Sequence, residues 1–277
     1  MFAPVPAPPH YTVFDLGTLG GANVLGAGLN NRSEVVGRLG QNINDSQAFL
    51  WTKGKIIKIG PRGGGTTIAS QINDSGQVAG TIDPRNDISG KNAYAFLWQK
   101  GHLTRLDTPN VKTSYAEGIN GKGDIVGRAK FGLHQETGFL WQHGKMLELL
   151  PPSGNGTNPR AINDRGQIAG FCNIGAVVWM HEPGTAERIA SGDARAINNK
   201  GQVVGMSDGT AFLWQNGRLT GLGTLGKDFN NIDYSVAFGI NDKGQIVGNS
   251  SANSEPGTRE YTPPCVFMAK RGNVRFE

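Results

Sequence analysis

The chain has 277 residues and a formal net charge of +5, with a pI of about 9.2. This mildly basic balance permits an acidic partner without requiring one, and we expect no nucleic-acid partner. The two cysteines, Cys172 and Cys265, exclude a disulfide scaffold. No run reaches the roughly 18 apolar residues of a membrane-spanning helix, so we expect no membrane insertion.

The N-terminal segment begins as an extended lead-in. Residues 1–10 contain four prolines and no apolar stretch, so they do not have the pattern of a signal peptide. Residues 11–19 (YTVFDLGTL) resemble residues 219–225 (LTGLGTL), which form an expected outer strand further along the chain. We therefore expect residues 11–19 to complete the last sheet and remove open edges, with residues 273–277 as the competing segment.

A short signature recurs six times along the rest of the chain. It consists of an aliphatic residue and Asn, a tight turn, an aliphatic pair, a Gly and then an aromatic strand. The copies begin at Asn30, Asn73, Asn120, Asn163, Asn198 and Asn241, in steps of 43, 47, 43, 35 and 43 residues. A repeat of about 40 residues that contains several short strands is typical of one β-propeller blade.

The fifth copy shows how one repeat divides into four strands. Residues 194–198 form a short strand, and the turn 198–201 (NNKG) suits a type I turn with a Gly bulge. Residues 202–205 return as the second strand, and 211–214 (AFLW) form the third. The pair Asn216-Gly217 is the strongest hairpin signal in the chain, and residues 218–222 alternate as the fourth strand. Four antiparallel strands joined by tight turns make one blade.

Tryptophan closes the third strand in five copies. These residues are Trp51, Trp98, Trp141, Trp179 and Trp214, and Met268 takes the sixth place. A ligand-stacking platform is one interpretation, but equal spacing within every copy favours packing between blades.

The repeat therefore predicts an all-β fold. We expect a six-bladed β-propeller of four-stranded antiparallel blades, with the N-terminal strand closing the last blade. The lead-in would occupy residues 1–10 and a single propeller domain residues 11–277.

Three of the recurrent segments resemble a known family. Residues 15–21 (DLGTLGG), 240–248 (INDKGQIVG) and 211–214 (AFLW) are similar to the HAF-type bacterial repeat, a family of extracellular repeats. The resemblance covers about residues 11–270 and implies a bacterial origin and, often, export, although this chain shows no signal peptide. It carries no catalytic residues, because the shared positions are structural.

The chain has no recognisable catalytic or metal-binding motif. The five histidines lack ligand spacing, and no zinc pattern, catalytic Cys–His signature or nucleophile elbow is present. We therefore expect no metal and no cofactor.

Two variable positions in each copy are the best candidates for function. One lies two residues before each copy's apolar-Asn pair, and the other directly follows the second-strand Gly. In a propeller these side chains ring one mouth of the central channel. They are Ala27, Ser70, Glu117, Arg160, Arg195 and Phe238 at the first position, and Arg38, Thr81, Arg128, Phe171, Met206 and Asn249 at the second.

The composition of this ring suggests an anionic ligand. Arg38, Arg128, Arg160 and Arg195 could hold a carboxylate or phosphate in bidentate geometry. The apolar members Phe171, Met206 and Phe238 would line the same site, and Glu117 is the candidate general base. Salt bridges between blades are the alternative role for these charges.

We therefore predict a monomeric, ligand- or partner-binding propeller whose partner is a small anionic molecule or an unidentified protein. Two alternatives stay open. One is a metal-independent hydrolase, lyase or cyclase at the same mouth, by analogy of fold. The other is a structural cell-surface repeat protein.

Overall fold

The computed structural model describes residues 24–40, 46–61, 65–84, 92–106, 110–132, 135–150, 156–180, 186–226, 233–251, 265–270 and 273–275. These residues form strands and turns, and within these ranges there is no helix that could cross a membrane. The predicted all-β class and the four-stranded antiparallel repeat are confirmed, because the strands form six four-stranded sheets. The lead-in expected at residues 1–10 lies outside the described residues.

The first three sheets follow one another along the chain. The first contains β1 (Val24–Leu29), β2 (Val35–Leu39), β3 (Gln47–Thr52) and β4 (Lys55–Ile59). The second contains β5 (Thr66–Ile72), β6 (Val78–Asp83), β7 (Tyr94–Gln99) and β8 (His102–Arg105). The third contains β9 (Val111–Ile119), β10 (Ile125–Phe131), β11 (Glu136–Gln142) and β12 (Lys145–Leu149).

The last three sheets repeat the pattern. The fourth contains β13 (Thr157–Ile162), β14 (Ile168–Cys172), β15 (Gly175–Trp179) and β16 (Ala186–Ala190). The fifth contains β17 (Asp193–Ile197), β18 (Val203–Ser207), β19 (Thr210–Gln215) and β20 (Arg218–Gly223). The sixth contains β21 (Ser235–Ile240), β22 (Ile246–Ser250), β23 (Cys265–Lys270) and β24 (Asn273–Arg275).

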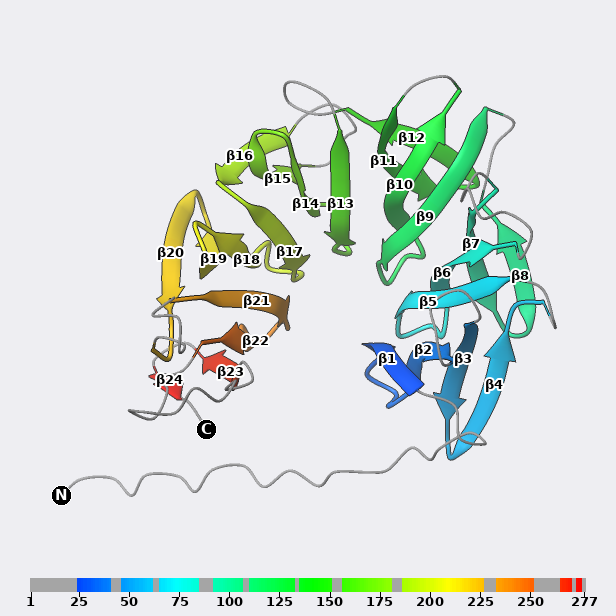
Figure 1. Ribbon diagram of the computed structural model, residues 1–277, viewed down its shortest axis with the longest axis horizontal. Coiled ribbons are helices and arrows are strands. Elements are labelled where there is room, and N and C mark those ends of the chain that lie inside the picture. The colour runs from blue at the N-terminus through cyan, green and yellow to red at the C-terminus, as the bar shows by residue number, and fades with distance from the viewer. Residues whose placement is uncertain are drawn as a thin grey trace, which may run out of the picture.

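The six sheets stand side by side in an arc around an open middle (Figure 1). The first strand of each sheet faces this middle, and the fourth lies on the outside. Neighbouring sheets touch where the second strand of one sheet meets the first strand of the next. These contacts join β2 to β5, β6 to β9, β10 to β13, β14 to β17 and β18 to β21. The position of a side chain along the first two strands therefore decides whether it meets a neighbouring sheet or the middle of the arc.

The sixth sheet differs from the expectation. Its fourth strand is β24, which pairs with β23 through Met268–Arg275, Ala269–Val274 and Lys270–Asn273. The competing C-terminal segment thus takes the place that we assigned to residues 11–19. Those N-terminal residues lie outside the described part of the chain. A two-residue connection favours the C-terminal segment, because closing so short a loop costs little entropy.

Both tight turns of the repeat have the predicted geometry. In the fifth sheet the N–H of Gly201 donates to the carbonyl of Asn198 at 3.0 Å, and Gly201 has a φ of 76°. Asn216 and Gly217 have φ values of 51° and 75°, the two positive values that a type I′ hairpin requires.

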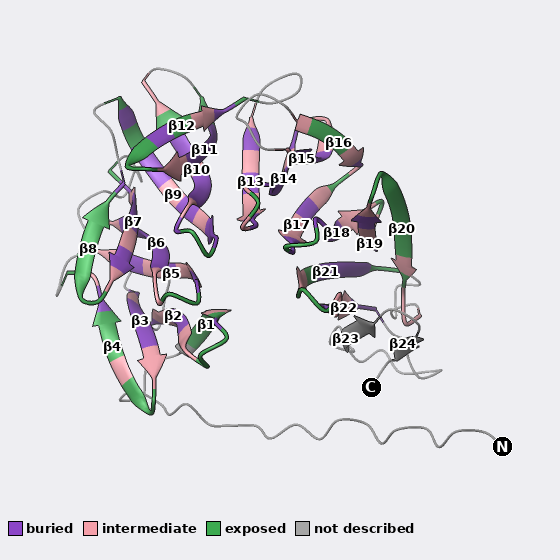
Figure 2. Ribbon diagram, turned by 180° about the vertical axis from the view of Figure 1, so that it is seen from behind, coloured by how far each residue is buried: buried purple, intermediate pink, exposed green. Residues whose placement is uncertain are grey.

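The hydrophobic core lies between sheets rather than within them. Trp98 packs with Leu50 and Ile59 of the preceding sheet, and Trp179 packs with Leu140 and Leu149. The predicted packing role of the tryptophans is confirmed for these residues. Burial is concentrated on the inner and middle strands, whereas β4, β8 and β20 are largely exposed (Figure 2).

Candidate functional site

Each inner strand carries one extra residue at the same place. The pairing with the second strand skips a residue between Pro159 and Ala161 in β13, and the same interruption occurs in the five other first strands. The skipped residues are Ala27, Ser70, Glu117, Arg160, Arg195 and Phe238. These are the six residues of the first predicted ring. A β-bulge turns its extra side chain away from the ladder, so the ring positions are free of the alternation that packs the sheets.

The second predicted ring lies on the neighbouring strands. Its members are paired with the residues four positions before the end of each first strand, namely Arg38 with Leu25, Thr81 with Ile68, Arg128 with Tyr115, Phe171 with Asn158, Met206 with Asp193 and Asn249 with Val236. Directly paired residues of antiparallel strands lie on the same face of a sheet. A third set of residues therefore accompanies the two predicted rings.

Ion pairs connect the third, fourth and fifth sheets at this level. Glu117 lies between two arginines, with Oε1 3.5 Å from Arg128 Nη2 and Oε2 3.7 Å from Arg160 Nη1. Asp193 also lies between two, with Oδ1 4.0 Å from Arg160 Nε and Oδ2 3.1 Å from Arg195 Nε. Two of these contacts cross from one sheet to the next, as the salt-bridge alternative expected.

The row of charges ends at Glu136, whose Oε1 is 3.0 Å from Arg128 Nη1. We call this row the charged arc; its members, in order, are Glu136, Arg128, Glu117, Arg160, Asp193 and Arg195. Positive and negative groups alternate along it, so the three guanidinium groups are only partly available as a positive surface.

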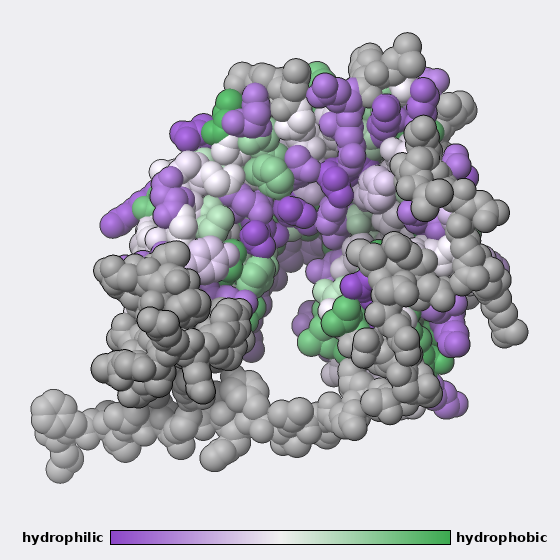
Figure 3. Space-filling model, in the orientation of Figure 1, coloured by the Kyte–Doolittle hydropathy of each residue, from purple (hydrophilic) through white to green (hydrophobic). Residues whose placement is uncertain are grey.

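An aromatic ring lies under each of the three arginines. Arg128 lies over Tyr115 at 5.3 Å, Arg160 over Phe171 at 5.3 Å and Arg195 over Phe238 at 5.1 Å, measured to the ring centroid. Such cation–π contacts hold a guanidinium plane in place and leave its edge free to donate. Figure 3 shows the hollow in the middle of the molecule, with hydrophilic side chains gathered along one wall.

Two predicted site residues are not part of this arrangement. Arg38 lies in the first sheet, where its Nη1 donates to Ser46 Oγ at 3.5 Å. Met206 is half-buried on β18, opposite Asp193, and has no polar contact with the charged arc. Of the eight candidate residues, Glu117, Arg128, Arg160, Phe171, Arg195 and Phe238 are the ones brought together.

Asp193 is a member of the site that sequence reasoning missed. Burial raises the pKa of its carboxyl group above the usual value, although the charges of Arg160 and Arg195 oppose that rise. Its Oδ1 is buried and accepts no hydrogen bond from the described residues. Tyr115 was missed in the same way. Counting four residues back from each copy's Ile would have found both, because the bulge shifts the pairing by one residue.

No group of three or more potential metal ligands occurs among the described residues. Each carboxylate of the charged arc lies within 4.0 Å of an arginine nitrogen.

Similarity to solved structures is confined to the fold. A structure of prolyl endopeptidases aligns over 94% of this chain and 42% of that chain, at 11% identity and a TM-score of 0.61. The structures that this chain resembles are β-propeller proteins. The fold is a β-propeller. Its sheets are from here on called blades one to six.

Two further structures align at lower similarity. One is the β-propeller domain of the Trilobed protease from Pyrococcus furiosus, at 11% identity and a TM-score of 0.44, over 92% of this chain and 67% of that one. The other is the acylaminoacyl peptidase of Pyrococcus horikoshii, at 14% identity and 0.45, over 76% and 37%. This chain thus spans less than half the length of the endopeptidase and acylaminoacyl peptidase chains.

No family model and no curated protein matches the sequence. The resemblance to the HAF-type repeat therefore stays a prediction, and with it the bacterial origin and the export that the resemblance implies.

Proposed function

We propose that this propeller binds a small molecule at the charged arc. The observation that carries the proposal is that Arg160 makes only long ionic contacts and stays part-exposed. Its contacts with Glu117 and Asp193 are 3.7 and 4.0 Å long, beyond the range of a hydrogen bond, and its side chain is 38% exposed. A guanidinium group with five donors, held over an aromatic ring, is therefore part-exposed and has donors to spare.

The chemistry of the arc restricts the ligand. A carboxylate or phosphate would accept from Arg160 and Arg195 in the bidentate manner that guanidinium groups favour. Glu117 and Asp193 lie beside those donors and would repel a bare anion, so the ligand also carries hydroxyl or ammonium donors for them. We propose an anionic molecule of mixed polarity, with Phe171 and Phe238 forming apolar sides of the site.

The test is calorimetric titration of the intact chain with citrate and with inorganic phosphate as probes. Replacement of Arg160 and Arg195 together by Ala should weaken probe binding by at least 100-fold, since each charged hydrogen bond contributes about 1.5–3 kcal/mol. Arg218→Ala, an exposed arginine on the outer strand β20, is the matched control and should bind as the unaltered protein does. Unchanged affinity of the double variant for a probe that binds would place the site elsewhere, and the absence of binding by both probes would refute the anionic ligand.

The raised pKa of Asp193 is the observation that favours the alternative of a metal-independent enzyme. A part-buried carboxyl group with a raised pKa exchanges its proton closer to neutral pH than an ordinary one. A hydrolase, lyase or cyclase at this mouth would therefore use Asp193, rather than the predicted Glu117, as its proton acceptor. Titrated into the protein in a separate calorimetric experiment, a substrate would give continuing heat, whereas a ligand that is only bound gives heat that saturates.

A further inference from the structure

A row of asparagine side chains joins the blades near the middle of the arc. In the turn of blade two, Asn73 Oδ1 accepts from the N–H groups of Ser75 and Gln77, both at 3.0 Å. Its Nδ2 reaches across to blade three and donates to the carbonyl of Asn120 at 2.9 Å. The same bond links Asn30 to Asn73, Asn120 to Asn163, Asn163 to Asn198 and Asn198 to Asn241, at 2.9–3.1 Å. Each asparagine thus shapes its own turn and holds the next blade.

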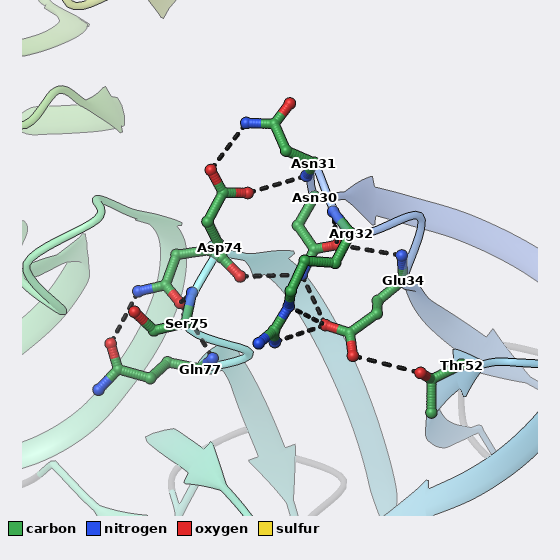
Figure 4. A network of polar contacts seen from close by, with 9 residues as sticks. Asn30, Asn31, Arg32, Glu34, Thr52, Asp74, Ser75 and Gln77 are labelled. Atoms are coloured by element: carbon green, nitrogen blue, oxygen red, sulfur yellow. Dashed lines mark hydrogen bonds and ion pairs between the residues drawn. The ribbon is translucent and has the colours of Figure 1, made fainter.

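The residues that follow these asparagines form a second row. The N–H and Nδ2 of Asn31 donate to the two carboxylate oxygens of Asp74 at 2.8 and 2.7 Å (Figure 4). In the other half of the arc, Asn199 lies between two carboxylates. It donates to Asp242 Oδ1 through its N–H at 2.8 Å, and to Asp164 Oδ2 through Nδ2 at 2.9 Å. Its own Oδ1 accepts from the N–H of Asp164 at 2.8 Å.

The two ends of these rows are unlike and complementary. At the blade-six end, Asn241 Nδ2 donates only within its own turn, to Gln245 Oε1, and Asp242 accepts only from blade five, as far as the described residues extend. At the blade-one end, the carbonyl of Asn30 accepts from Ser33 of its own turn and from no other blade within those same ranges. Within the described residues, one end therefore has a donor and a carboxylate with no bond to a following blade, and the other has a carbonyl and a side-chain amide with no bond to a preceding blade.

The apolar side chains at the two ends match in the same way. Val247 of β22 is 47% exposed, whereas Val204, its counterpart in blade five, is fully buried. Leu29 of β1 is 66% exposed, whereas Ile72 at the same position of blade two is 4% exposed. In every interior blade, these two positions are buried against the neighbouring blade. The exposed pair therefore marks the two faces that lack a neighbour among the described residues.

We propose that blade six docks directly on blade one of the same chain and closes a ring of six blades. In this contact Asn241 Nδ2 donates to the carbonyl of Asn30, and Asn31 lies between Asp242 and Asp74 as Asn199 lies between Asp164 and Asp242. The order Asn31, Asp74, Gly121, Asp164, Asn199 and Asp242 then places no two carboxylates next to each other around the ring. The arc already curves toward such a contact (Figure 1). A tether within one chain also gives an effective concentration in the millimolar range, which favours this contact over a second copy.

A disulfide test distinguishes the possible partners. The pair Asn31→Cys and Asp242→Cys is made in a chain whose own cysteines are replaced by Cys172→Ala and Cys265→Ala. The matched control pair, Asn199→Cys and Asp242→Cys, joins two blades that are already in contact. The separated pair, Asp74→Cys and Asp164→Cys, has blade three between its members. After oxidation, intact mass and non-reducing electrophoresis measure the fraction joined within one chain.

In a closed ring the Asn31/Asp242 pair should join within the monomer to the same extent as the control pair, and at least ten times more than the separated pair. Bonds formed only between chains would assign this face to a second copy. Joining no greater than in the separated pair would show that the ring does not close through these residues. Either result overturns the proposal.

A second measurement does not depend on the disulfide. Asn31→Asp would lie between two carboxylates in a closed ring, as Asn199→Asp does in the present structure. Both variants should then lower Tm by the same amount, and salt should relieve both losses. If Asn31→Asp lowers Tm by no more than half as much as Asn199→Asp does, then Asp74 is the only carboxylate beside residue 31. That result would contradict closure of the ring.

Discussion

Asp193 lies between the guanidinium groups of Arg160 and Arg195 on the inner surface of the arc. Burial raises its pKa more than the two positive charges lower it. The folded protein therefore holds this proton more tightly than the unfolded chain, and the charged form of Asp193 reduces stability once the pH rises through the folded pKa. Below the unfolded value of the pKa this loss is absent.

Asp193→Asn should accordingly raise Tm at pH 7 by a few degrees, the scale of about 1 kcal/mol in a domain of this size. The gain should shrink as the pH is lowered toward the ordinary titration range of a carboxyl group, because a growing fraction of the unaltered carboxyl group is then protonated. Thermal unfolding followed by circular dichroism at several pH values measures it. Asp208→Asn is the contrast, since hydrogen bonds from Ser191 and Ser207 lower the pKa of Asp208 and this substitution should lower Tm at pH 7. A gain in Asp193→Asn that is independent of pH would contradict this account.

Single residues also show where sequence reasoning reaches its limit. The ring positions Glu117, Arg160 and Arg195 could be found because they vary while the residues around them repeat. Asp193 and Tyr115 could not be found by the alternation of a regular strand, since one bulged residue changes which side chains share a face. The ion pairs of the charged arc were foreseen only as an alternative, because a sequence does not give the distance between adjacent blades.

The first hairpin of each blade is the element that joins the blades. In blade four, Asn163 Oδ1 accepts from Arg165 N at 3.0 Å and Gln167 N at 2.9 Å, and Nδ2 donates to the carbonyl of Asn198 at 2.9 Å. Asn163 is 3% exposed, so water cannot replace these bonds. The turn itself could be predicted from its Asn and Gly. The bond to the next blade could not, because the same residues would form an ordinary turn in isolation.

Asn163→Ala should lower the free energy of unfolding by about 2–4 kcal/mol, since buried partners left without a hydrogen bond cost roughly 1–3 kcal/mol each. Urea unfolding followed by tryptophan fluorescence measures the change. Asn173→Ala, in the exposed turn between β14 and β15, is the control and should change stability by less than about 0.5 kcal/mol. Equal losses in the two variants would show that the row of asparagines does not stabilise the fold.

At the scale of the whole molecule, stability is shared between adjacent blades. One cluster combines Ala95 and Leu106 of blade two with Ile119, Ile125 and Phe139 of blade three, and similar clusters lie between other neighbours. A structure of this kind behaves as a row of units, each of which depends on the units beside it. The repeat period was sufficient to predict this architecture. The strand that completes blade six was not predictable, because residues 11–19 and the C-terminal segment both have strand character.

Phe139→Ala should lower the free energy of unfolding by about 3–5 kcal/mol, the usual cost of truncating a buried Phe. Hydrogen exchange followed by mass spectrometry should show protection lost mainly in blades two and three, with blade five much less affected. Leu103→Ala, on the exposed strand β8, is the control and should leave the exchange pattern unchanged. A uniform loss across all six blades would instead identify the whole arc as one cooperative unit.

The direction of the asparagine bonds has a consequence for how such a protein can change its size. Each of the five bonds runs from one copy to the next copy along the chain, and each donating asparagine meets the backbone carbonyl of the next asparagine. A duplicated or deleted copy would leave this row intact, so the number of blades can change by whole repeats without redesign of the joint. Only the residue after each asparagine must suit its new neighbours, because two adjacent carboxylates would repel. Within this row of hydrogen bonds, the insertion of a copy is thus constrained at one position per copy.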